Sequence, residues 1–154
     1  MSDRGGTISD ALRDLKDKPA WGLTRTHGSM FFLEIGDPKL RAGEKKQHGE
    51  WHFLFQMCHW RFEDANTVLI GSDDSPEAID DQFRKLQLQL FDHAEIVSPS
   101  NDLRIVFSSG VCVMTFSTCS QATDGETQWQ LYTPSDTVWI SYTTGRIVAR
   151  DANE

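Results

Sequence analysis

The chain has 154 residues, which is the length of one ordinary domain, and 38% of its residues are hydrophobic. This composition excludes a disordered chain, because such chains lack the apolar residues that a core needs. The formal net charge of −8 argues against direct binding of nucleic acid or of an anionic membrane, since both attract Lys and Arg. It is compatible with a basic protein partner, and equally with an acidic surface that serves solubility.

We expect a single domain over residues 1–154, with residues 1–6 disordered. The N-terminus has no apolar run after its charged residues, and no window approaches the ~18 apolar residues of a membrane span. The cysteines Cys58, Cys112 and Cys119 are odd in number and lack the spacing of a zinc knuckle or a disulfide framework, which predicts reduced thiols. Together these features predict a cytoplasmic protein.

Two helices are expected. Apolar residues at helical spacing predict the first over 8–18, capped by Thr7 or Ser9 and ended by Pro19. Ser75 and Pro76 are typical of a helix start, and the apolar spacing that follows predicts a second helix over 76–87.

Most of the remaining chain alternates between apolar and polar residues, which is typical of strands. The expected strands cover 21–26, 30–35, 50–63, 67–70, 94–97, 103–107, 111–116, 128–133, 137–142 and 146–149. Turn residues end the second strand at Gly36-Asp37-Pro38, and polar loops should fill 37–49 and 117–126. The pattern predicts an α+β fold, mainly an antiparallel β-sheet with an N-terminal helix and one mid-chain helix.

The most distinctive charged feature is a cluster of five acids within nine residues: Asp73, Asp74, Glu77, Asp80 and Asp81. Acids at a helix N-terminus are stabilised by the helix dipole. This effect alone can explain the presence of Asp73, Asp74 and Glu77, without a binding role. Asp80 and Asp81 lie further along the helix and gain little from it. A carboxylate patch of this kind would attract a basic partner, so the cluster is either a solvated helix face or a partner-binding surface.

No motif in the chain predicts catalytic residues, a cofactor or a metal. His48, His52 and Cys58 share strand parity with Glu50 between them, and all are metal-ligand types. On one extended strand, however, His48 and Cys58 would lie about 33 Å apart at ~3.3 Å per residue. A metal site would therefore need ligands from other strands, and nothing in the sequence nominates them.

A second hypothesis places a small-ligand pocket on the sheet. Glu50, His52 and Trp60 share one face of the long strand predicted over 50–63, and they could line such a pocket. This would make the protein a small-ligand binder or an enzyme of unknown class, although the lack of any catalytic motif favours a protein that is not an enzyme.

Several aromatic-rich stretches follow one another in a fixed order. They are 28–36 (Gly-Ser-Met-Phe-Phe-Leu-Glu-Ile-Gly), 49–54 (Gly-Glu-Trp-His-Phe-Leu), 58–63 (Cys-His-Trp-Arg-Phe-Glu), Ser72-Asp73-Asp74 and 129–134 (Trp-Gln-Leu-Tyr-Thr-Pro). With them the chain resembles a widespread group of small uncharacterised bacterial proteins over roughly residues 20–140. Acidic members of such families resemble immunity proteins, which neutralise a toxin. The resemblance implies no catalytic residue.

The leading hypothesis is therefore an immunity-type inhibitor that masks a basic protein toxin, such as a nuclease, with the acidic cluster at 73–81. The small-ligand binder is the first alternative. The second is a self-associating module, in which an edge strand would pair across a homodimer.

Overall fold

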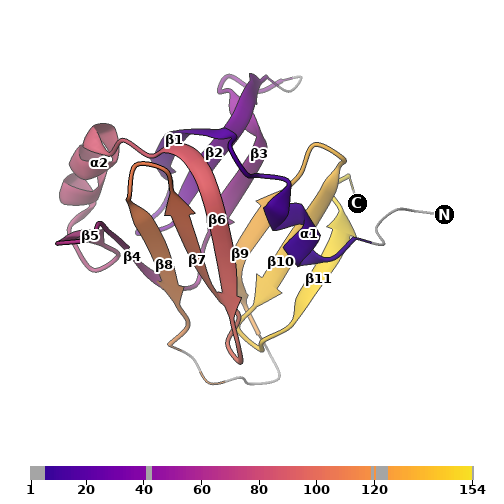
Figure 1. Ribbon diagram of the computed structural model, residues 1–154. Coiled ribbons are helices and arrows are strands. Elements are labelled where there is room, and N and C mark those ends of the chain that lie inside the picture. Colours follow the sequence, from indigo (N-terminus) through magenta and orange to yellow (C-terminus); the bar gives the residue numbers. More distant parts are fainter. Residues whose placement is uncertain (1–5, 41–42, 119, 121–124, 154) are drawn as a thin grey trace.

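The computed structural model describes residues 6–40, 43–118, 120 and 125–153 (Figure 1). These residues form two helices and eleven strands. In chain order they are α1 (Ile8–Arg13), β1 (Pro19–Arg25), β2 (Phe31–Lys39), β3 (His48–Phe55), β4 (His59–Glu63), β5 (Val68–Gly71), α2 (Pro76–Lys85), β6 (Gln89–Val97), β7 (Asp102–Phe107), β8 (Cys112–Phe116), β9 (Thr127–Tyr132), β10 (Thr137–Tyr142) and β11 (Ile147–Asp151).

The strands form a sheet in the order β11-β10-β9-β3-β2-β1-β6-β7-β8-β4-β5, and the paired neighbours are antiparallel. The predicted α+β fold with its two helices is confirmed. Only two residue pairs, Pro19–Leu90 and Ala20–Gln89, join β1 to β6. The sheet bends at this joint, so that β6–β8 lie in front of β1–β3 (Figure 1).

Both helices begin where their capping residues predict. The Thr7 side chain accepts a hydrogen bond from the Asp10 backbone N–H, and Ser75 does the same for Ala78. The first helix is shorter than the predicted 8–18, because the chain leaves the α-helix after Arg13. Three i→i+3 hydrogen bonds follow, and Leu15 is still buried, so the apolar spacing identified the right residues.

The second predicted strand does not end at Gly36-Asp37-Pro38. It continues as β2 to Lys39, past a register shift between Ile35 and Pro38 against β3. Gly36 has φ +84, a backbone conformation that favours glycine and is typical of a bulge. The predicted loop over 37–49 therefore loses both of its ends to strands, since β3 begins at His48.

The predicted strand over 50–63 is two strands in the structure. β3 ends at Phe55, Met57 is 52% exposed in the connection, and β4 pairs with β5 and β8 in the other half of the sheet. Because of this break, the alternation of faces along β3 does not tell which face the side chains of β4 are on. The consecutive strands β4 and β5 pair as an antiparallel hairpin, and so do β1 and β2, and β9 and β10.

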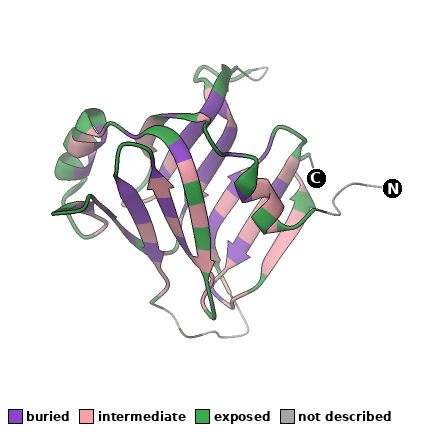
Figure 2. Cartoon of the chain, viewed as in Figure 1, coloured by how far each residue is buried: buried purple, intermediate pink, exposed green. Residues whose placement is uncertain are grey.

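The two halves of the sheet share an aromatic core. The buried ring of Phe31 on β2 packs against Phe55 on β3, against Trp60 and Phe62 on β4, and against Phe83 on α2. Figure 2 shows buried and half-buried residues alternating along β7, and half-buried and exposed residues alternating along most of β6. None of the described helices is long and apolar enough to cross a membrane. The predicted disorder of residues 1–6 falls mostly outside the described residues.

Candidate functional site

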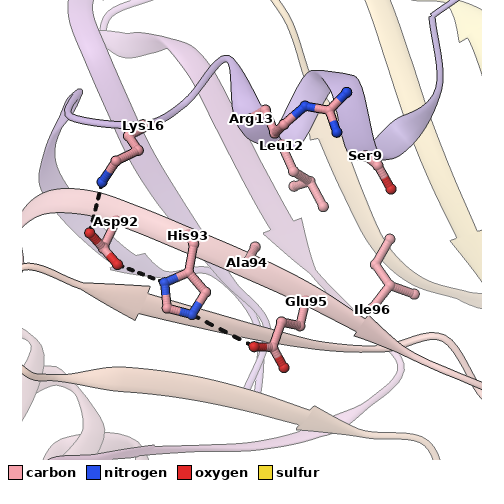
Figure 3. Close-up of a pocket in the computed structure, with 9 residues that line it drawn as sticks. All are labelled: Ser9, Leu12, Arg13, Lys16, Asp92, His93, Ala94, Glu95 and Ile96. Atoms are coloured by element: carbon pink, nitrogen blue, oxygen red, sulfur yellow. Dashed lines mark hydrogen bonds and ion pairs between the residues drawn. The ribbon is translucent and has the colours of Figure 1, made fainter.

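A hollow of about 560 Å³ lies between α1 and β6 (Figure 3). It lies beyond Phe91, past the backbone hydrogen bonds that join Asp17 and Lys18 to that residue, where α1 packs beside β6. Leu12 on α1 and Ala94 and Ile96 on β6 point into the space between helix and strand. The hollow therefore has an apolar floor, and its size is that of a small-molecule pocket.

A chain of charged side chains borders one side of this hollow (Figure 3). Lys16 Nζ lies 2.9 Å from Asp92 Oδ1, and His93 Nδ1 lies 2.6 Å from Asp92 Oδ2. His93 Nε2 is 3.7 Å from the carboxylate of Glu95. The hydrogen bonds from His93 and Lys16 lower the pKa of Asp92, so this carboxylate stays ionised beside the apolar floor.

Two of the five predicted partner-binding acids are paired with cations of the same chain. Arg25 on β1 donates from Nε and Nη2 to the two carboxylate oxygens of Asp80, at 2.8 and 3.1 Å. Lys85 donates to Asp81 at 2.8 Å. These hydrogen bonds lower the pKa of both carboxyl groups. Much of their charge is thus compensated within the molecule.

The other three acids are exposed at the start of α2. Asp73 is 88% exposed and lies 3.3 Å from His59 Nδ1, whereas Asp74 accepts a hydrogen bond from the Gly71 backbone N–H at 2.8 Å. Glu77 lies in the first turn of the helix. The helix dipole and the turn explain their positions, and the cluster does not form one continuous patch of uncompensated charge.

Of the three residues predicted to line a ligand face, Glu50 and His52 both lie on β3, whereas Trp60 lies apart from them on β4. Trp60 is 2% exposed in the core, where it stacks on Phe83. Glu50 turns toward Lys18 and the Asp37 backbone N–H, next to Gly36. His52 lies opposite Glu34 in the β2–β3 register and stacks on Tyr132 of β9.

His52 belongs instead to a group that the sequence did not indicate. Donor atoms of Glu34, His48 and His52 all lie within 4.8 Å of one another, and such residue types can hold a metal ion. Glu34 and His52 are 1% and 6% exposed. The signal available in the sequence was the β2–β3 hairpin register, which places Glu34 beside His52; the approach of His48 depends on the bulge.

The surroundings of the two described cysteines do not favour a reactive thiolate. Cys58 and Cys112 are unpaired, and burial raises the pKa of Cys58 to about 12. A thiol of this kind is protonated at neutral pH and is a poor nucleophile. Cys119 and much of the predicted loop over 117–126 lie outside the described residues.

Comparison of the chain with protein-family models, curated proteins and solved structures finds no match.

Proposed function

We propose that the protein binds a small organic molecule, largely apolar with one polar end, in the hollow between α1 and β6. The observation that carries this proposal is a hollow of about 560 Å³ with an apolar floor and a charged border. Small-molecule sites commonly measure roughly 300–1,000 Å³ and combine apolar walls with a few polar groups. Leu12, Ala94 and Ile96 would contact the apolar part of the ligand.

The charged border gives this site its polarity. Lys16 and Asp92 compensate each other, and His93 joins Asp92 to Glu95. The charged residues that line the hollow are Arg13, Lys16, Asp92 and Glu95, two of each sign, so with His93 counted as neutral the border adds no formal net charge. A neutral or zwitterionic polar end suits such a border better than a bare anion or cation.

The immunity-type inhibitor predicted from the sequence has less support than the small-ligand alternative. Asp80 and Asp81 bind cations of their own chain, so a basic toxin would have to compete with Arg25 and Lys85 for them. Self-association through β5 or β11, at the edges of the sheet, stays a prediction.

The test uses the fluorescent probe N-phenyl-1-naphthylamine, which is neutral and has apolar rings and one polar N–H group. We expect saturable binding, with amide NMR shifts in the wild-type protein confined to residues 9–16 and 92–96. Ala94→Trp should abolish binding because the indole fills the hollow. Ala65→Trp adds the same side chain on an exposed turn and should bind the probe like the wild type. Shifts elsewhere, or equal binding by both variants, would contradict the proposal.

A further inference from the structure

Glu34, His48 and His52 come together through the pairing of β2 with β3. Glu34 is directly opposite His52 in the register, so both side chains lie on one face of the sheet. His48 is four residues from His52, which on a regular strand would separate their Cα atoms by about 13 Å. Their rings nevertheless lie 4.8 Å apart, beside the register shift between Ile35 and Pro38. A bulge redirects side chains in this way.

Neighbouring residues provide both hydrogen-bond partners and space for the buried side chain of Glu34. Its Oε1 accepts a hydrogen bond from the Gly49 backbone N–H at 2.9 Å, and its Oε2 lies 3.0 Å from His48 Nδ1. On the neighbouring strand, Gly22 leaves room for it, because a Cβ atom there would lie 2.9 Å from Glu34 Cγ. Burying a carboxylate is costly unless hydrogen bonds or a cation compensate its charge.

We propose that Glu34, His48 and His52 bind a divalent transition-metal ion, for which Zn²⁺ is the best chemical match. Two imidazoles and one carboxylate are a common Zn²⁺ ligand set. A tetrahedral ion with bonds of about 2.0–2.2 Å separates its ligand atoms by roughly 3.3–3.6 Å. The present donors lie within 4.8 Å, so small side-chain rotations complete the set.

Glu44, which is not one of the three proposed ligands, supports this assignment through its contact with His48. Its carboxylate lies 3.5 Å from His48 Nε2, the ring nitrogen that does not face Glu34. His48 can therefore bind the ion through Nδ1 while its Nε2–H faces a carboxylate, an arrangement that orients metal-binding histidines. The ion would take the place of the hydrogen bond between His48 Nδ1 and Glu34 Oε2, and three protein ligands leave a position for water. This site is independent of the hollow between α1 and β6.

The experiment titrates the full chain, treated with EDTA and dialysed, with Zn²⁺ in a calorimeter. We expect one ion per chain. Glu34→Gln and His48→Gln should weaken binding by more than the roughly 10–100-fold that loss of an outer-shell partner costs, and Glu44→Gln should fall within that range. His59→Gln replaces a half-exposed histidine elsewhere and should bind like the wild type.

A second measurement does not depend on how well the variants fold. In ¹H–¹⁵N spectra of the wild-type imidazoles, Zn²⁺ should shift the ring nitrogens of His48 and His52 and leave those of the other three histidines in place. The proposal is wrong if no saturable binding occurs, if the shifts fall on other histidines, or if Glu34→Gln and His48→Gln, once shown to be folded, bind Zn²⁺ with wild-type affinity. The group would then be a hydrogen-bonded pair that holds the bulge.

Discussion

Asp73 and Asp80 are both acids near the start of α2, but their surroundings differ. Asp80 receives two hydrogen bonds from Arg25, a residue 55 positions away on β1, whereas Asp73 is 88% exposed beside His59. The first ties α2 to the sheet, and the second is available to solvent. At the scale of single residues, a sequence count of acids therefore overstates the charge that a partner could use.

The Arg25–Asp80 pair predicts how stability depends on pH. Hydrogen bonding to Arg25 holds the pKa of Asp80 below its ordinary value of 3.8. The stabilisation is thus present above that ordinary value and is lost as the pH falls through the lowered pKa. Asp80→Asn should lower the free energy of unfolding at neutral pH, and the difference should shrink toward zero in strong acid. Urea denaturation across pH measures this, with Asp73→Asn as the control that should change little at any pH.

At the scale of elements, local signals were sufficient where the structure depends on neighbouring residues. The β1–β2 and β9–β10 hairpins and the starts of both helices follow from turn and capping residues within a few positions. The sequence pattern predicted the wrong strand ends in two situations. In one, a strand continues through a bulge, and in the other, a strand ends where no strong turn residues mark its end. Gly36-Asp37-Pro38 has the residues of a turn but forms a bulge, and the apolar alternation continues through Met57 although the strand ends before it.

The same limits explain why the sequence pattern did not predict the two candidate sites. On one straight strand His48 and Cys58 lie too far apart to bind one ion, but the pairing of β2 with β3 places Glu34 within reach of His48. The hollow between α1 and β6 lies beyond the short pairing of β1 with β6, and strand periodicity does not encode how far that pairing extends. Contacts between residues distant in the sequence decide both sites.

The β2 bulge gives a prediction at this scale. Gly36 has φ +84, and a Cβ atom there would lie 2.5 Å from Glu50 Cγ. Gly36→Ala should therefore cost about 1–3 kcal/mol of stability from backbone strain, with displacement of Glu50 in addition. It should also weaken Zn²⁺ binding, because the bulge positions His48. Urea denaturation and calorimetry measure the two effects.

Gly28→Ala is the matched control for this variant. Gly28 also has a positive φ, +58, but a Cβ atom there meets nothing within 4 Å. It should show the cost of strain alone and bind Zn²⁺ normally. Equal effects of the two substitutions on Zn²⁺ binding would mean that the bulge does not position the ligands.

At the scale of the whole molecule, the bent sheet makes one core out of two halves. Phe31 on β2 contacts rings from β3, β4 and α2, so the pairs on both sides of the bend depend on the same buried side chain. A small β1–β6 joint can hold the halves together because this packing adds to its few hydrogen bonds. The halves should therefore unfold as one unit.

Phe31→Ala tests this expectation. Removing a fully buried phenylalanine leaves a cavity and should cost about 3–5 kcal/mol. Tryptophan fluorescence and far-ultraviolet circular dichroism should still report one coincident transition in urea, at a lower midpoint than in the wild type. Val68→Ala, on the exposed edge of β5, should stay within about 0.5 kcal/mol of the wild type. Two separated transitions in the Phe31→Ala variant would show that each half of the sheet has a core of its own.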